Sequence, residues 1–298
     1  MTVTPIRYVS DDEDSARWLS FPFRDGDIVI STRSKSGTTW MQMICALLVF
    51  QSPDLPEPLA TLSPWLDWKI APIGEVIGRL EAQQHRRFVK THTPLDGVPQ
   101  DGRATYIVVA RDPRDMYVSL YHQGDNIDRD AVRRLLGQPE RAPDDVRPER
   151  PPLDQALEAW IGRDDSPQQS MDSIRGVFHH VTDAWRRRET QSNVLLVHYD
   201  DLLHDLDGQM RDLAARLGLD VAEKRWPELV DAATFTTMRE RASAVVPDTA
   251  GVLKDANAFF RRGSSGAWRD VMTAGQVEHY WRRVDGLAPP EVVAWLHR

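Results

Sequence analysis

The sequence has a single cysteine, Cys45, among 298 residues, so no disulfide can form within the chain. Such low cysteine usage is typical of a reducing compartment, and the apolar neighbours of Cys45 predict a buried structural thiol. Long hydrophobic runs are also missing, because the longest, residues 41–50, is far too short to span a bilayer. The amino-terminal residues lack the basic and apolar regions of a signal peptide. We therefore expect a cytoplasmic protein without a transmembrane segment.

Positive charge is in deficit, since 37 Lys and Arg residues face 45 Asp and Glu residues and leave a net charge of −8. This balance argues against a general nucleic-acid-binding protein. Histidine and cysteine do not occur at metal-ligand spacings, so we expect no metal site. A small anionic ligand needs only a local cluster of cations, and the overall charge is compatible with one.

Short β-rich segments alternate with helical segments along the chain. The patterns predict strands at 27–32, 87–90, 104–110 and 193–198, and helices at 38–50, 114–122 and 202–217. This alternation predicts an α/β fold, a central and mainly parallel sheet flanked by helices, in one domain spanning 1–298. Two polar, proline-containing stretches do not fit the alternation. We expect an excursion or lid at 124–152 and a mobile loop at 243–263 beside the cofactor and acceptor.

Residues 34–40, SKSGTTW, join the first predicted strand to the first predicted helix. The N–H groups and dipole of a helix N-terminus attract phosphate, Gly37 allows a close approach of the backbone, and Lys35 adds a positive charge. Lys35 precedes Gly37, and the first glycine of G-x-x-x-x-G-K-[ST] is absent. The segment is therefore a P-loop-like strand–loop–helix that differs from the loop of ATPases and GTPases. A capping loop would explain the hydroxyl residues, but not Lys35 and Gly37 in this setting.

Two further segments carry arginines suited to a phosphate. Arg111 ends the third predicted strand, where ligands of open α/β sheets bind, and Ser119 follows about two helical turns later. Arg261 and Arg262 precede Gly263 in a segment whose flexibility suits a phosphate clamp. Taken alone, each segment is better explained by surface salt bridges or by a solvated basic loop.

Considered together, the segments 35–40 (KSGTTW), 110–121 (ARDPRDMYVSLY) and 261–269 (RRGSSGAWR) resemble the signature regions of a known enzyme family. This is the cytosolic-type sulfotransferase family, which uses 3′-phosphoadenosine 5′-phosphosulfate (PAPS). The order and spacing agree from about residue 23 to residue 278, and three weak motifs in order are specific. The resemblance implies an α/β enzyme that moves a sulfuryl group from PAPS to an acceptor hydroxyl without a metal.

The resemblance also implies which residues bind the donor. Those that would hold the 5′-phosphosulfate are Lys35, Ser36, Gly37, Thr38 and Thr39. Those that would hold the 3′-phosphate are Arg111, Ser119, Arg261, Arg262 and Gly263. Those that would contact the adenine are Trp40, Tyr199, Thr234 and Phe235. Without the resemblance, Trp40 and Phe235 are equally well described as core aromatics.

Lys90-Thr91-His92 resembles the family's catalytic Lys-Ser/Thr-His segment. It implies that His92 removes the acceptor proton while Lys35 stabilises the leaving phosphate and Lys90 assists near the sulfuryl group. Imidazole suits this role because it exchanges protons near neutral pH. Two alternatives stay open. A kinase or hydrolase is disfavoured by the order of the loop residues, and a non-catalytic nucleotide-binding module would have no use for His92.

The chain departs from the family pattern at several positions. Ser34, preceded by Arg33, stands where the family usually has proline. Ala233 replaces an expected hydroxyl residue near the adenine, and Ala267 replaces a common acidic residue. Residues 269–278 resemble the family's dimerisation segment with substitutions, so a homodimer through them is a weaker prediction.

The acceptor is not specified by these motifs. A set of apolar residues in the segment 63–78 either lines an acceptor pocket or packs in the core: Trp65, Leu66, Trp68, Ile70, Ile73, Val76 and Ile77. An apolar lining predicts a lipophilic alcohol, a phenol or a glycolipid as acceptor. Because the long insert favours a large acceptor, a glycolipid is the leading hypothesis.

Overall fold

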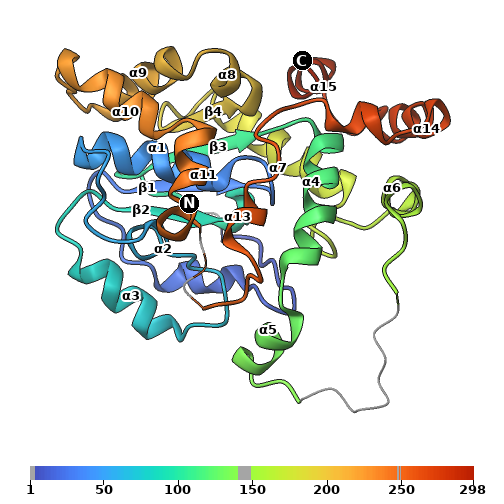
Figure 1. Ribbon diagram of the computed structural model, residues 1–298, viewed down its shortest axis with the longest axis horizontal. Coiled ribbons are helices and arrows are strands. Elements are labelled where there is room, and N and C mark those ends of the chain that lie inside the picture. The colour runs from blue at the N-terminus through green and yellow to red at the C-terminus, as the bar shows by residue number, and fades with distance from the viewer. Residues whose placement is uncertain (1–3, 140–148, 247, 249) are drawn as a thin grey trace.

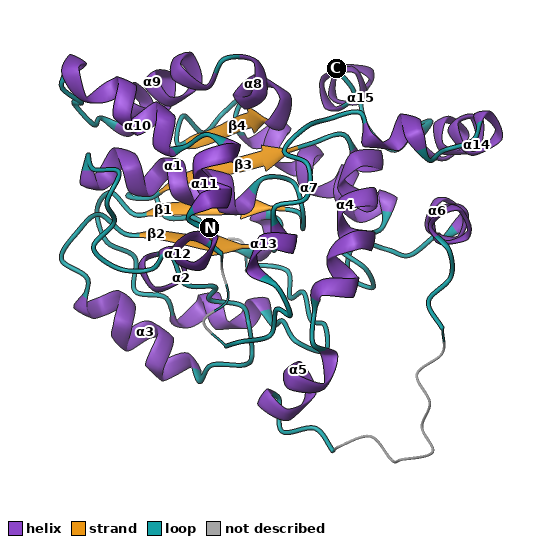
Figure 2. Cartoon of the chain, viewed as in Figure 1, coloured by secondary structure: helices purple, strands orange, loops and turns teal. Residues whose placement is uncertain are grey.

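The computed structural model describes residues 4–139, 149–246, 248 and 250–298. Its centre is a four-stranded sheet in the order β2-β1-β3-β4, in which every pairing is parallel (Figure 2). The strands are β1 (Ile28–Thr32), β2 (Phe88–Thr91), β3 (Thr105–Ala110) and β4 (Val194–His198). Each strand begins and ends within one residue of its predicted bounds, and the predicted parallel α/β fold is confirmed.

Helices cover both faces of the sheet (Figure 1). The two faces are built from alternate residues of each strand, so Ile28 and Ile30 of β1 pack into one core cluster and Val29 into another. Burial on both sides explains why these strands are nearly continuous apolar runs. The helices over the first face are α1 (Thr38–Phe50), α9 (Leu206–Leu217) and α10 (Trp226–Ala232). Those over the second face are α3 (Ile73–Ala82) and α7 (Ile174–Arg187).

A third apolar cluster supports the helix that follows β3. This helix, α4 (Pro113–Asn126), begins at a proline and is capped by Asp112, whose carboxylate accepts the Arg114 N–H at 2.9 Å. The cluster also contains residues of α7 and of three helices on the right of Figure 1, which are α6 (Leu153–Gly162), α14 (Ala274–Val284) and α15 (Pro290–Leu296). The cluster therefore holds α4 in place beside the carboxyl end of the sheet.

The prediction of one continuous helix at 202–217 is wrong. Two helices occur there, because α8 (Tyr199–His204) ends before Asp205, and the Asp205 carboxylate accepts the Gly208 N–H at 2.9 Å to cap α9. The remaining short elements are η1 (Ser15–Ser20), α2 (Leu59–Leu62), η2 (Leu95–Gly97), η3 (Glu223–Arg225), α11 (Phe235–Glu240) and η4 (Ala267–Asp270).

The two stretches expected to be loops contain short helices. Within 124–152 lie the end of α4 and a separate helix, α5 (Arg129–Leu135), while residues 140–148 lie outside the described part of the chain. The predicted loop at 243–263 contains α13 (Ala256–Phe259) and all of α12 (Ala242–Val245) except its first residue. Sequence composition missed these helices because each has only a turn or two and is surrounded by polar residues.

The strand order determines where a ligand can enter. The chain leaves β1 for β2 on one side and later reaches β3 on the other, so the connections after β1 and β3 run to opposite sides of the sheet. A crevice opens at the carboxyl ends of strands at such a switch point. The loops that follow β1, β2, β3 and β4 all meet at this edge.

Candidate active site

The loop after β1 is shaped by residues with left-handed backbone. Gly37, the residue before α1, has φ 106°, and a Cβ atom there would lie only 3.0 Å from the Tyr199 ring. Lys35 also has a positive φ of 61°. No side chain of the described residues caps α1, so its first N–H groups remain directed at the crevice. The predicted phosphate-binding loop is thus in place at a helix N-terminus.

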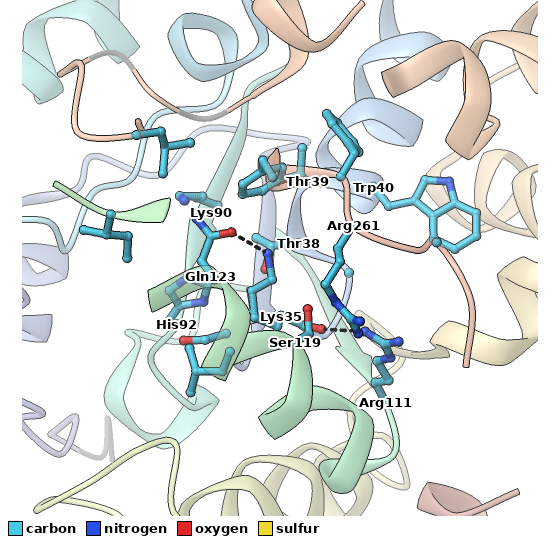
Figure 3. A pocket seen from close by; sticks show the side chains of 18 of the residues that line it. Lys35, Thr38, Thr39, Trp40, Lys90, His92, Arg111, Ser119, Gln123 and Arg261 are labelled. Carbon is cyan, nitrogen blue, oxygen red and sulfur yellow. Dashed lines mark hydrogen bonds between the residues drawn. The ribbon is translucent and has the colours of Figure 1, made fainter. Parts of the chain in front are cut away.

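The Lys35 ammonium lies at the centre of a group of cations (Figure 3). It donates a hydrogen bond to Gln123 Oε1 at 3.2 Å and lies 4.2 Å from the Phe259 ring centroid. Burial and repulsion from Arg111, Arg261 and Lys90 lower the pKa of Lys35 to about 7. A bound anion would relieve this repulsion, so the charge arrangement favours an anionic ligand.

Arg111 lies at the end of β3, beside Arg261 and Ser119 (Figure 3). Its guanidinium donates to the Lys35 carbonyl at 3.3 Å and to the Ser264 carbonyl at 2.7 Å, and it stacks 4.3 Å from the Tyr199 ring centroid. The Nε atoms of Arg111 and Arg261 are buried and have no hydrogen-bond partner in the described structure. Unpaired buried donors are costly, and an anion placed between them would supply the missing acceptors.

The arginine loop, residues 259–266, is held in place by hydrogen bonds to α4. The Asp115 carboxylate of α4 accepts the Gly266 N–H at 2.6 Å and the Trp268 N–H at 3.1 Å. Arg114, paired with Asp112 at 2.6 Å, lies 3.7 Å from the Trp268 ring centroid. These contacts tie the loop to the helix that carries Ser119, and so bring the second and third sequence motifs together.

His92 follows β2 and faces the same crevice. Its Nδ1 lies 2.7 Å from the Thr32 carbonyl, which can only accept, so Nδ1 carries the proton and Nε2 keeps a free lone pair. Burial, followed by Lys90 and Arg33, lowers the pKa of His92 and keeps the ring neutral. The edge of the ring meets Trp65 at a centroid distance of 4.8 Å. A neutral imidazole with a free Nε2 is the form that a general base requires.

The segment around His92 is held by an aspartate that the sequence patterns did not single out. The buried carboxylate of Asp67 accepts hydrogen bonds from the hydroxyls of Thr91 and Thr93, the latter at 2.8 Å, and from the Trp18 indole. Burial raises the pKa of Asp67 to about 6. Lys90 lies 4.1 Å above the Trp65 ring, and burial lowers the pKa of Lys90 to about 8.

One cavity of about 290 Å³ connects these groups. It brings together nearly all the predicted site residues: Lys35, Gly37, Thr38, Thr39, Trp40, Lys90, His92, Arg111, Ser119, Tyr199, Phe235, Arg261, Arg262 and Gly263. Ser36 and Thr234 are not among its described lining residues. Ser36 is buried under the loop, and the Thr234 hydroxyl caps α11 by accepting the Thr237 N–H. Gln123 lines the cavity and was missed, although it lies one helical turn beyond Ser119.

The far end of the cavity has a different lining. Trp65 and Trp68 stack at a centroid distance of 5.3 Å, and Asp12 is the one carboxylate among the described lining residues. Other apolar residues that line the cavity include Ile127, Val132, Val252 and Leu253. Of the seven apolar residues between 63 and 78, only Trp65 and Trp68 line the cavity, whereas Leu66 and Val76 pack in the core against η1 and β2.

Comparison with known proteins agrees with the site. Residues 25–286 match the model of the sulfotransferase domain family. The chain therefore belongs to the sulfotransferase family, as the three sequence motifs predicted, and it is a sulfotransferase.

Individual relatives show how close the likeness is. A glycolipid sulfotransferase of Mycobacterium bovis (strain BCG / Pasteur 1173P2) is 41% identical, over 98% of this chain and 94% of that protein. Sulfotransferase 2B1 of Mus musculus is 28% identical, over 93% of this chain and 75% of that protein. Among solved structures, mouse sulfotransferase SULT7A1 complexed with PAP superposes with a TM-score of 0.69 at 21% identity, over 94% of this chain and 90% of that one. This structural likeness shows a shared fold.

Two observations bear on partners. Across the described ranges, no helix combines the length and apolar character needed to cross a membrane. In the same ranges, no three His, Cys, Asp or Glu side chains are grouped as metal ligands would be.

Proposed function

We propose that this sulfotransferase moves the sulfuryl group of PAPS to a hydroxyl group of a glycolipid or a related lipophilic alcohol. The observation that carries the proposal is the cluster of cations in one cavity. Lys35 lies at the N-terminus of α1 close to Arg111, Arg261 and Lys90, and Ser119 lies beside Arg111 (Figure 3). PAPS has two anionic groups, a 5′-phosphosulfate and a 3′-phosphate, and a cluster of several cations suits a ligand with more than one anionic group.

The adenine would lie in the aromatic part of the cavity formed by Trp40, Tyr199 and Phe235. Trp40 and Tyr199 meet edge to face at 5.2 Å, and the Trp40 indole donates to the Ala233 carbonyl at 2.8 Å. These side chains are therefore fixed before a base arrives, which lowers the entropy cost of binding. The complex of the mouse relative with PAP agrees with this donor.

The chemistry follows from the placing of His92 and Lys35. His92 Nε2 takes the proton of the acceptor hydroxyl as the hydroxyl oxygen forms a bond to sulfur. The bond from sulfur to the phosphate oxygen breaks in the same step, and Lys35 stabilises the charge that develops on that oxygen. General-base catalysis of this kind contributes about 10²–10⁴-fold to the rate. Lys90, whose pKa of about 8 keeps it mostly charged near neutral pH, supports the sulfuryl oxygens.

The lining of the cavity favours a glycolipid as the acceptor. Asp12 can accept hydrogen bonds from sugar hydroxyls, while the apolar wall made by Ile127, Val132, Val252 and Leu253 suits a hydrocarbon chain. The mycobacterial relative is named for glycolipids, which agrees with this lining. A panel of acceptors tests the proposal, and turnover of simple phenols without any turnover of glycolipids would contradict it.

The donor is tested by calorimetric titration with PAP (3′-phosphoadenosine 5′-phosphate), ATP and AMP, on wild type and on Arg111→Ala. We expect tight binding of PAP alone, and its loss in the variant, because Arg111 contacts only the 3′-phosphate in this proposal. Equal or tighter binding of ATP would overturn the assignment of the donor and favour a nucleotide-dependent kinase or hydrolase.

A further inference from the structure

Arg33 is a buried cation between the phosphate-binding loop and His92, and it belongs to the stretch that departs from the family pattern. Its side chain is 3% exposed. One guanidinium nitrogen donates to the His92 carbonyl, and the other donates to Asp172 Oδ1 at 2.8 Å. A buried arginine needs both a counter-charge and hydrogen-bond acceptors, and here the two needs are met by different segments of the chain.

Asp172 is itself firmly placed. Its carbonyl accepts a hydrogen bond from the Trp160 indole of α6 at 2.9 Å, and the following residue, Ser173, caps α7. Its second carboxylate oxygen accepts the Ser34 hydroxyl at 3.1 Å. Ser34, which stands where the family usually has proline, therefore supplies a donor that proline lacks. The aspartate holds two consecutive residues of the loop after β1 against a helical scaffold.

We propose that Arg33 and Asp172 are a positioning pair that fixes His92 relative to the phosphate-binding loop. Thr32, the last residue of β1, accepts the Nδ1 proton of His92 at 2.7 Å, and Arg33, the first residue of the loop, donates to the His92 carbonyl. The junction of β1 and the loop therefore contacts both the ring and the backbone of the histidine. A planar guanidinium can serve two acceptors at a fixed angle, which the ammonium of a lysine does not reproduce.

The role follows from the chemistry of the step and rests on the proposed function of His92. The acceptor proton moves to His92, which follows β2, while Lys35 of the loop after β1 holds the leaving phosphate. The two groups must keep their separation for in-line transfer, and a displacement of about 1 Å costs on the order of 10²-fold in rate. The pair is outside the cavity lining and touches neither substrate, so it acts through His92.

The test removes both charges together, because a single substitution would leave a buried charge without its partner. We expect Arg33→Met with Asp172→Asn to lower kcat by about 10- to 100-fold while the affinity for PAP changes by less than about threefold. Arg33→Lys should recover only part of the rate. A second readout is the ¹⁵N NMR spectrum of labelled histidine, with His92 assigned by its loss in His92→Gln. The Nδ1-protonated form should dominate in wild type and decline in the double variant.

A second buried ion pair provides a matched control. Arg87 and Asp27 pair at the opposite, amino-terminal ends of β2 and β1, with exposures of 1% and 2%. Arg87→Met with Asp27→Asn removes a pair that is more deeply buried than Arg33 and Asp172, whose exposures are 3% and 30%, and its folded fraction should keep the wild-type kcat. A wild-type kcat in the folded Arg33/Asp172 variant would overturn the proposal, as would a lower kcat with unchanged His92 signals. Failure of the proposed function is seen separately, as full activity of His92→Gln.

Discussion

Lys35 is a residue whose ionisation depends on what the cavity contains. Burial and the neighbouring cations lower the pKa of Lys35 to about 7. A phosphate in the site favours the charged form. Binding of the nucleotide should therefore be accompanied by uptake of a proton.

The pH dependence of PAP affinity tests this coupling. Below pH 7 Lys35 is already charged, whereas above pH 7 it must gain a proton on binding, so affinity should fall as the pH rises from 7 to 9. The phosphates do not contribute to this trend, because their second pKa lies near 6. Calorimetry in two buffers of different ionisation enthalpy measures the uptake. Lys35→Met should bind more weakly and lose most of the pH dependence, and an equal slope in the variant would contradict the assignment.

His92 gives the second prediction at this scale. We expect His92→Ala to lower kcat by about 10²–10⁴-fold and to leave PAP affinity unchanged, because in the proposed mechanism the ring acts on the acceptor and not on the nucleotide. Single-turnover assays and calorimetry measure the two effects. The surface substitution His204→Ala serves as control and should leave both unchanged. A loss of PAP binding in His92→Ala would mean that the histidine has a different role.

Most residues that a sequence motif named line one cavity in the structure. The loop lysine, His92 and the arginines were named because each lies at a strand end or beside a glycine. Gln123 could have been predicted, because it lies one helical turn beyond Ser119. The roles of Asp172 and Asp67 could not be predicted from the sequence. Both residues act through hydrogen bonds to segments that are distant in the sequence, and these hydrogen bonds form only in the folded chain.

At the scale of elements, the arginine loop depends on a close contact with α11. Gly263 has φ 64°, and a Cβ atom there would lie 2.3 Å from the Phe235 ring. Neither the ring nor the backbone can give way without changing the proposed adenine site. The glycine is therefore needed both for its backbone angle and for its lack of a side chain.

Gly263→Ala tests this contact. The clash should displace Phe235 or the two arginines and lower PAP affinity by at least about tenfold, beyond the cost of about 1 kcal/mol for a left-handed alanine. Gly286→Ala is the matched control, because Gly286 also has a positive φ of 74° but a Cβ atom there would meet no atom of the described residues within 4 Å. It should lower Tm without affecting PAP affinity, as calorimetry and thermal unfolding would show. Equal affinities in the two variants would contradict the role of the contact.

The elements themselves were largely predictable because the strands are short apolar runs with clear ends. α1 was predicted with its observed bounds, since an apolar face begins directly after the Gly37 loop. The helices at 129–135 and 256–259 were not, because they are stabilised by caps and tertiary contacts rather than by an apolar periodicity.

At the scale of the whole molecule, the cavity spans segments from the amino-terminal region to residue 264. Asp12, from the amino-terminal segment, is held beside Trp68 because the Lys69 N–H donates to its carbonyl at 2.8 Å. The acid run that includes Asp12 had no assigned role in the sequence. Asp12 lines the cavity together with the stacked tryptophans, and the proposed function assigns this part of the cavity to the acceptor.

Asp12→Asn should therefore alter acceptor preference. We expect kcat/KM for a glycolipid to fall by about tenfold, as for loss of a charged hydrogen bond, while a simple phenol is unaffected. Asp11→Asn, an equal change of charge at the exposed neighbouring residue, is the control. A similar loss for both acceptors would place Asp12 outside the acceptor site.

The homodimer through residues 269–278 stays a prediction at this scale. The segment includes the end of η4 and the start of α14, and most of its residues are exposed or half-buried. If the segment pairs two chains, light scattering at micromolar concentration should give twice the mass of 34.0 kDa. A monomeric mass would reject this route to a dimer.

The positions of the cavity segments along the chain have a consequence for synthesis. The loop at 33–37 and His92 are translated early, whereas Arg261, Arg262 and the residues that bind Asp115 are translated late, shortly before α14 and α15. During synthesis, the phosphate-binding loop and His92 are therefore present before the two arginines proposed to bind the nucleotide. The donor therefore has no complete site on a nascent chain, and it can assist folding only after translation has reached the final helices.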